Sequence, residues 1–196
     1  MVAVVVVALC LLPFLSRFKI ASAERSVVVL KDAKGLCGGV IIEGDKILTA
    51  GHCADGNIEF VQEINGHESL AFLVKVDHVR DLALFEDEAL QSPALPIAEI
   101  TPDKGDKVWM IGHPLGQLWS ISAGHISNVI NDTGTSWLQL DFCAVPGNSG
   151  GPILSTDGKI IGIVSHDLLQ NRFGAIIPQL SYAADLGAIH KFLWSK

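Results

Sequence analysis

Residues 146–152, with the sequence PGNSGGP, place Ser149 among glycines in a segment that directly precedes an apolar run. Gly147 lets the backbone bend so that its N–H can point the same way as the N–H of Ser149. Two convergent N–H groups beside a hydroxyl supply what acyl transfer needs, namely a nucleophile next to an oxyanion hole. The segment therefore predicts nucleophilic chemistry at Ser149, with an ordinary Gly/Asn/Ser turn as the alternative interpretation.

A histidine and an aspartate stand where such a serine needs partners. His52 follows an apolar strand-like run, and Asp81 opens the apolar run 82–85. A lone histidine near a strand end is more often structural than catalytic, and an aspartate that opens a strand is commonly a turn residue. In an acyl-transfer site, His52 would take the Ser149 proton and return it to the leaving group, while Asp81 would hold the histidine in the correct tautomer. Asp77 competes for the carboxylate role, but the run that directly follows Asp81 favours Asp81.

The composition excludes several classes of protein. Hydrophobic residues make up 49% of the 196 residues and charged residues 18%, which is too apolar for a disordered chain. The net charge is −7 and no basic cluster is present, so we expect no nucleic-acid partner. We also expect no cofactor and no metal. A zinc site is disfavoured because Cys37, His52 and Cys53 lack C-x-x-C or H-x-x-x-H spacing and no fourth ligand is evident.

The sequence contains four cysteines. Cys10 lies in the apolar N-terminal segment, whereas Cys37 and Cys53 flank a short predicted hairpin that could bring their side chains together. In an exported protein these two predict a disulfide, and Cys143, which has no evident partner, is expected to be a buried free thiol. Small apolar core positions are the alternative interpretation for all of them.

Residues 1–15 are almost wholly apolar and are shorter than the about 20 residues that a membrane-spanning helix needs. The small residues Ala21, Ser22 and Ala23 follow and match a signal-peptidase site. We therefore expect a signal peptide over residues 1–23 and a secreted or extracytoplasmic protein. The alternatives are a first buried strand and an uncleaved membrane anchor through residues 1–15, and only the anchor would bring the chain to a membrane.

The rest of the chain consists mainly of short apolar runs separated by turn-forming Gly, Asn and Asp residues. About eleven runs at this spacing are typical of an all-β sandwich or barrel rather than of alternating strands and helices. The runs are residues 27–30, 40–42, 47–49, 58–61, 70–76, 82–85, 108–111, 121–129, 137–140, 160–164 and 175–177. The proline-bearing residues 91–107 predict a connector between two β halves. Apolar residues at mixed spacings of three and four predict one amphipathic helix over residues 179–194.

Several motifs, taken in order along the chain, resemble those of one known family. They are CGGV at residues 37–40 with LTAGHC at 48–53, DLAL at 81–84, IGHPLG at 111–116 with ISAGHIS at 121–127, PGNSGGP at 146–152 and GIVS at 162–165. Together they resemble the chymotrypsin-fold (trypsin-like) serine proteases, and most closely the HtrA/Deg-type protease domain. HtrA/Deg proteins usually carry a PDZ domain after the protease domain, and we expect none in this sequence.

The resemblance implies an all-β, chymotrypsin-like fold of two six-stranded antiparallel β-barrels with a C-terminal helix. The protease domain would cover residues 24–196. Within it we place barrel one at about 26–92, the connector at about 93–105, barrel two at about 106–178 and the helix at about 179–194. His52 and Asp81 would come from the first barrel and Ser149 from the second. The backbone N–H groups of Gly147 and Ser149 would form the oxyanion hole.

The resemblance also implies a serine-type endopeptidase that hydrolyses peptide bonds of protein or peptide substrates through an acyl-enzyme intermediate. Substrate-binding roles fall to Cys143, near the base of the primary specificity pocket, and to Ser165 and His166 at the strand that lines the cleft. Trypsin-like enzymes carry an aspartate where this chain has Cys143, so we expect small or medium apolar side chains rather than Arg or Lys there. His166 could instead favour an acidic residue, and a loop residue at a strand end without such a role is the alternative interpretation. A protease fold that binds peptides without cleaving them is the alternative function.

Overall fold

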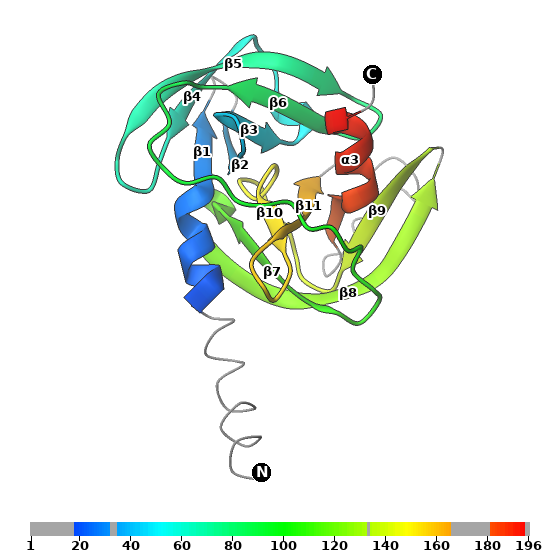
Figure 1. Ribbon diagram of the computed structural model, residues 1–196. Coiled ribbons are helices and arrows are strands. Elements are labelled where there is room, and N and C mark those ends of the chain that lie inside the picture. Colours follow the sequence, from blue (N-terminus) through cyan, green and yellow to red (C-terminus); the bar gives the residue numbers. More distant parts are fainter. Residues whose placement is uncertain (1–17, 32–34, 133, 166–180, 195–196) are drawn as a thin grey trace.

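The computed structural model describes residues 18–31, 35–132, 134–165 and 181–194. In these ranges the chain forms two closed antiparallel barrels of six strands each, one above the other in Figure 1, and it ends in a helix. The expected all-β fold of two six-stranded barrels with a C-terminal helix is confirmed. Residues 1–15 lie outside the described ranges, and no helix within those ranges combines the length and the apolar character needed to cross a membrane.

Barrel one is built from the strands of the first part of the chain. They are β1 (Val27–Lys31), β2 (Leu36–Ile42), β3 (Lys46–Thr49), β4 (Ile58–Gln62), β5 (Glu68–Asp77) and β6 (Leu82–Glu86). Around the barrel they follow the order β1-β2-β3-β6-β5-β4, and the pairing of β4 with β1 closes it. The turn between β4 and β5 agrees with the antiparallel pairing of these two strands, because its Gly66 has a φ of +85°, a region that favours glycine.

Barrel two follows with the same topology. Its strands are β7 (Lys107–Gly112), β8 (Ser120–Asp132), β9 (Thr135–Leu140), β10 (Pro152–Leu154), β11 (Ile160–Ser165) and β12 (Ser181–Asp185). Their closed order, β7-β8-β9-β12-β11-β10, repeats strand for strand the order of barrel one. The helix α3 (Leu186–Trp194) comes directly after β12.

The described residues form three hydrophobic clusters, one inside each barrel and one between the barrels. The first closes around Phe85 in barrel one and the second around Met110 in barrel two, both fully buried. The third joins Val27 of β1, Ile111 of β7 and Phe192 of α3. Because each large apolar side chain contributes about 1.5–3 kcal/mol when buried, this shared core fixes the two barrels against each other.

Residues 18–23 form a helix that leads through η1 (Glu24–Ser26) into β1, in blue in Figure 1. Ile20 and Ala23 of this helix are only 2% and 1% exposed, and both belong to the core that the barrels share. The predicted boundary between leader and protease domain, after Ala23, therefore falls inside a packed segment. Cleavage at that position stays a prediction.

An irregular segment, residues 87–106, connects the two barrels and contains the connector placed at about 93–105, whereas Lys107, the last residue of the proline-bearing stretch, already belongs to β7. The N–H of Leu95 donates to the carbonyl of Ile41 in β2 at 2.8 Å. On the other side, the N–H of Ala98 donates to the carbonyl of Ile160 in β11 at 2.9 Å. The connector is thus bonded to both barrels rather than looped away from them.

The start of the C-terminal helix is predicted wrongly. The sequence predicts a single helix over residues 179–194, but Ser181–Asp185 form β12 and α3 begins only at Leu186. The whole of β12 is buried, because Ala183 packs in the core of barrel two while Tyr182 and Ala184 pack in the core that the barrels share. A strand buried on both faces lacks the alternation of a half-exposed strand, so its apolar residues merge with those of the helix. The predicted run at 175–177 lies outside the described residues.

Candidate active site

His52 and Asp81 meet because the strands beside them are neighbours in barrel one. His52 lies in η2 (Gly51–Cys53), just after β3, and Asp81 directly precedes β6, which pairs with β3. Nδ1 of His52 lies 2.8 Å from Oδ2 of Asp81 and 3.1 Å from Oδ1. The backbone N–H of His52 also donates to Oδ1, at 2.8 Å. The structure thus brings together two of the side chains that the sequence singles out.

Asp81 is held as a carboxylate. Burial by itself would raise its pKa, but hydrogen bonds and charge attraction from His52, together with the Ser165 hydroxyl, which donates to Oδ2, bring the pKa below its ordinary value of 3.8. An ionised carboxylate only accepts hydrogen bonds, so the partners assign the His52 proton to Nδ1. The other ring nitrogen, Nε2, then carries a lone pair that can accept a proton.

Asp77, the alternative carboxylate, makes different contacts. Its Oδ1 accepts the backbone N–H groups of Val79 and Arg80 at 2.9 and 3.0 Å, and its Oδ2 pairs with the Arg80 guanidinium at 2.5 Å. These contacts shape the turn that leads the chain from β5 to Asp81. Asp81 itself has a φ of +50°, a strained conformation for a residue with a side chain, and its contacts with His52 offset that strain.

Ser149 lies in the loop before β10, and this loop of barrel two reaches across to barrel one. The carbonyl of Ser149 accepts the N–H of Gly38 in β2 at 2.7 Å. Gly150 has a φ of +80° and packs so closely that a Cβ there would lie 2.1 Å from Oγ1 of Thr49. Ser149 is 7% exposed and lines, together with His52, a cavity of about 240 Å³. The three predicted side chains therefore gather at the junction of the barrels.

Two peptide groups in the loop before β10 are fixed through their carbonyls. The carbonyl of Pro146 accepts the N–H of Leu115 at 2.8 Å, and the carbonyl of Asn148 accepts the N–H of Gly151 at 3.0 Å. In a trans peptide the N–H points opposite to the C=O of the same unit. These bonds consequently fix the directions of the two N–H groups that the sequence assigns to an oxyanion hole.

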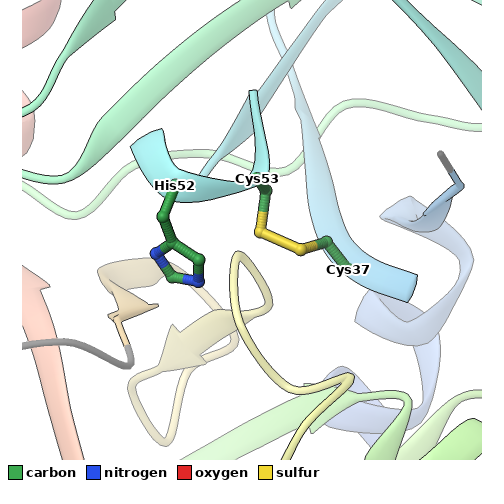
Figure 2. A group of neighbouring side chains, drawn as sticks. All are labelled: Cys37, His52 and Cys53. Carbon is green, nitrogen blue, oxygen red and sulfur yellow. A yellow bond between two sulfur atoms is a disulfide. The ribbon is translucent and has the colours of Figure 1, made fainter. Parts of the chain in front are cut away.

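Cys37 in β2 and Cys53 in η2 form a disulfide with Cα atoms 6.2 Å apart, so the predicted pairing is confirmed. Figure 2 shows the imidazole of His52 beside this bond, on the same short element. The ligand atoms of the three residues lie within 4.8 Å of one another, but the two sulfur atoms are bonded together rather than present as metal-binding thiolates. The disulfide therefore braces the element that carries His52.

Comparison with known proteins decides the family. Residues 37–163, more than half of the chain, match the family model of the trypsin-like peptidase domain. The chain belongs to the trypsin-like peptidase domain family. A DegP-like protein from Halomonas elongata, described as a probable periplasmic serine endoprotease, is 35% identical over 134 residues. That match covers 65% of this chain but only 28% of the relative, so the chain spans less than a third of the relative's length.

Solved structures of other proteases match over most of this chain. The serine endoprotease from Yersinia pestis is 29% identical with a TM-score of 0.76, and the match covers 90% of this chain and 64% of that one. The HtrA-type protease AlgW, solved with a tripeptide, is 26% identical with a TM-score of 0.76, over 91% of this chain and 64% of its own. These similarities confirm the resemblance to HtrA/Deg-type protease domains.

Three further residues of this trypsin-like peptidase domain are predicted to bind substrate. Cys143 is a free thiol, but the prediction that it is buried is wrong: it is exposed, because it lies in the loop after β9 and not in a barrel wall. Ser165, at the end of β11, is buried and donates its hydroxyl to Asp81. His166 lies outside the described residues. The substrate-binding roles of all three stay predictions.

One residue of the trypsin-like peptidase domain has contacts that the sequence does not indicate. His113, in the IGHPLG motif after β7, is fully buried between the barrels. Its backbone N–H donates to the carbonyl of Gly147 at 3.2 Å, next to Ser149. The motif marks the position of His113, but its partners are distant in the sequence, so only the folded structure connects it with the site.

Proposed function

We propose that this chain is a serine-type endopeptidase that hydrolyses peptide bonds in protein or peptide substrates, with His52, Asp81 and Ser149 as its catalytic triad. The observation that carries the proposal is the contact between His52 and the Asp81 carboxylate beside the cavity that Ser149 also lines. Membership of the trypsin-like peptidase domain family supports the same reaction. In such a triad, the side chains of the protein perform every proton transfer.

In the proposed reaction, Oγ of Ser149 attacks the carbonyl carbon of the peptide bond while Nε2 of His52 takes the hydroxyl proton. The N–H groups of Gly147 and Ser149 stabilise the charge that develops on the carbonyl oxygen. His52 then gives its proton to the leaving amine, the C–N bond breaks, and an ester on Ser149 remains. Water, deprotonated by His52, hydrolyses this ester to a carboxylic acid and restores the serine. Ionised Asp81 stabilises the imidazolium in both halves.

We also propose that the enzyme works outside the cytoplasm. A disulfide such as Cys37–Cys53 is typical of oxidising compartments, and the DegP-like relatives are described as periplasmic. A membrane contact would require the apolar residues 1–15 to be retained. N-terminal sequencing of the mature protein distinguishes retention from cleavage.

The test compares Ser149→Ala with the wild-type chain in its oxidised form. We expect the substitution to abolish casein cleavage and labelling by a fluorophosphonate probe, because the probe reacts with an activated serine. Ser155→Ala is the control and should keep both activities, since the contacts of its hydroxyl within the described residues are with Asp157 and Lys159, in the turn after β10. Wild-type activity in Ser149→Ala would contradict the proposal. A folded wild-type protein that fails both assays would favour peptide binding without cleavage.

A further inference from the structure

His113 is a buried histidine at the contact between the barrels. It follows β7 of barrel two, and its Nε2 lies 3.0 Å from the carbonyl oxygen of Val28 in β1 of barrel one. Its other ring nitrogen, Nδ1, accepts the backbone N–H of Trp119 at 3.0 Å. A carbonyl can only accept and an N–H can only donate, so these partners assign one form of the ring: a neutral imidazole with its proton on Nε2.

Residues 113–119, called here the clamp segment, are held around this ring. The indole N–H of Trp119 donates to the carbonyl of Val27 at 2.8 Å, and its ring meets the imidazole edge to face with centroids 5.5 Å apart. Leu115 and Trp119 have φ values of +50° and +52°, in a region that disfavours side chains. Such a backbone persists only where its surroundings hold it, so the clamp segment depends on these contacts with β1.

The clamp segment in turn holds the loop that carries Ser149. The N–H of His113 donates to the carbonyl of Gly147 at 3.2 Å, and the N–H of Leu115 donates to the carbonyl of Pro146 at 2.8 Å. Gly147 has a φ of +95° and approaches so closely that a Cβ there would lie 2.1 Å from the carbonyl oxygen of His113. The peptide unit between Pro146 and Gly147 is therefore fixed by the clamp segment, and its N–H points the opposite way.

We propose that His113 is a positioning residue for the oxyanion hole: as a neutral imidazole it ties the clamp segment to barrel one and so keeps the N–H of Gly147 in the orientation that binds the substrate carbonyl oxygen. The inference rests on the proposed serine-protease mechanism and deepens it. The oxyanion hole then depends on the docking of the two barrels, because Val27 and Val28 of β1 supply the accepting carbonyls. It also depends on the protonation state of one buried ring.

A proton added to His113 would go to Nδ1, where it would face the N–H of Trp119 and break that hydrogen bond. Burial lowers the pKa of His113 below the ordinary 6.5, the hydrogen bond to Val28 acts in the opposite direction, and the positive charge of Lys31 in β1 lowers the pKa further. The ring is therefore neutral near pH 7 and takes up its proton only in more acidic solution than an ordinary histidine. The unfolded chain binds this proton at a higher pH than the folded chain does. Lowering the pH therefore reduces the free energy of unfolding, and it also weakens the contacts that hold the clamp segment.

Two substitutions of similar shape separate the two hydrogen bonds of the ring. His113→Asn places an amide oxygen near the position of Nδ1 and keeps an acceptor for Trp119. His113→Gln places an amide N–H near the position of Nε2 and keeps a donor for Val28. We expect each to lower kcat for a peptide substrate about tenfold or more, which is part of the roughly 10²- to 10³-fold that loss of one oxyanion donor costs, with KM changed less than about threefold.

Two further measurements separate this role from a merely structural one. A peptide aldehyde adds to the serine to form a hemiacetal whose oxygen occupies the oxyanion hole, so its affinity should fall by the same factor as kcat. Below about pH 6, wild-type kcat/KM should fall more steeply than that of the non-titrating variants, because both His52 and His113 take up protons. His190→Asn, on α3, is the matched control and should keep the wild-type kcat and pH profile.

Nitrogen NMR of the imidazoles in the wild-type protein tests the protonation form of His113 without any substitution. The proposal can therefore be tested even if a variant fails to fold. We expect the Nε2–H form of His113 at pH 7, with a titration that coincides with the steep part of the activity profile. An Nδ1–H or charged ring at pH 7, or folded variants with wild-type kcat, aldehyde affinity and pH profile, would overturn the inference. A wild-type chain that neither cleaves peptides nor reacts with fluorophosphonate would instead refute the proposed function.

Discussion

At the scale of single residues, the site depends on a carboxylate that accepts three hydrogen bonds. Asp81 accepts from the backbone and the ring of His52 and from the hydroxyl of Ser165. Ser165 belongs to barrel two, so the second barrel helps to set the charge state of an aspartate in the first. A pKa held below 3.8 keeps Asp81 ionised at every pH where the histidine is neutral, and this keeps the His52 proton on Nδ1.

Replacing this carboxylate by an amide tests its role directly. Asp81→Asn should lower kcat on the order of 10⁴-fold, because an amide N–H would face Nδ1 and favour the wrong tautomer of His52. Asp77→Asn makes the same chemical change in the turn before it and should keep kcat within about tenfold, since Asp77 contacts Val79 and Arg80. Steady-state cleavage of a fluorogenic peptide measures both. A larger loss in Asp77→Asn than in Asp81→Asn would show that the carboxylate has been assigned wrongly.

The sequence motifs suffice to select the residues of the candidate site but not their neighbours. His52 and Asp81 stand at strand ends and Ser149 stands in the loop before a strand, each in a motif whose residue types indicate a chemical role, and the structure gathers all three. The contacts Ser165–Asp81 and His113–Val28 join residues of different barrels. Neither periodicity nor spacing carries information on how two barrels dock, so these contacts appear only in the folded chain.

At the scale of elements, the disulfide fixes η2 to β2, and its removal should have two effects. Replacing both Cys37 and Cys53 by alanine should lower the free energy of unfolding by about 3 kcal/mol, as expected for a closed loop of roughly 15 residues. It should also lower kcat, because η2 carries His52. Cys143→Ala removes an exposed free thiol and should change stability by less than about 0.5 kcal/mol. Urea unfolding without reductant measures the stability of both variants and of the wild-type chain. Equal stabilities of all three chains would contradict the prediction.

The helix over residues 18–23 gives a second prediction at this scale. Ile20→Ala should lower the free energy of unfolding by about 2–5 kcal/mol, because Ile20 is 2% exposed within the shared core. Phe18→Ala, on the same helix, removes a side chain that is 69% exposed and should cost less than about 0.5 kcal/mol. Urea unfolding compares the two. Equal effects would show that residues 18–23 do not pack with the barrels. In that case a mature protein beginning at Glu24 would be as stable as the chain that retains these residues.

The C-terminal elements show where sequence patterns cease to be informative. Asp185 caps α3, since its Oδ1 accepts the N–H of Ala188 at 2.8 Å, and an aspartate before an apolar run is a recognisable sign of a helix start. The five residues before α3 are buried on both faces as β12. Their burial comes from the core of barrel two on one face and from the core that the barrels share on the other. Most residues of these cores are distant in the sequence, so the local pattern cannot distinguish this strand from the helix that follows.

At the scale of the whole molecule, two barrels of one topology meet along a shared core. His52 and Asp81 come from barrel one, and Ser149 comes from barrel two. The sequence predicts two β halves, because turn residues separate short apolar runs on both sides of the proline-bearing connector. What it does not predict is the fit between them, which uses backbone contacts such as Gly38 with Ser149. The integrity of the candidate site is therefore a property of the barrel interface.

A charged side chain also links the end of the chain to barrel one. Lys75 of β5 donates to the carbonyls of Phe192 and Leu193 in the last turn of α3, and its ammonium lies 4.6 Å from the centre of the Phe192 ring. A cation in this position makes two favourable interactions, one with the dipole at the C-terminus of the helix and one with the face of the aromatic ring. We therefore expect Lys75→Met to lower the free energy of unfolding by about 1–2 kcal/mol.

The control for this prediction is a variant that removes a cation–π contact but leaves the C-terminus of α3 unchanged. Lys107 lies 4.8 Å from the centre of the Trp109 ring within barrel two, so Lys107→Met removes a similar cation–π contact without touching α3. It should cost at most about 1 kcal/mol, and amide hydrogen exchange in α3 should quicken only in Lys75→Met. Equal losses and unchanged exchange in α3 would mean that the helix is held by its apolar face alone. The predicted difference instead assigns Lys75 to the docking of α3 on barrel one.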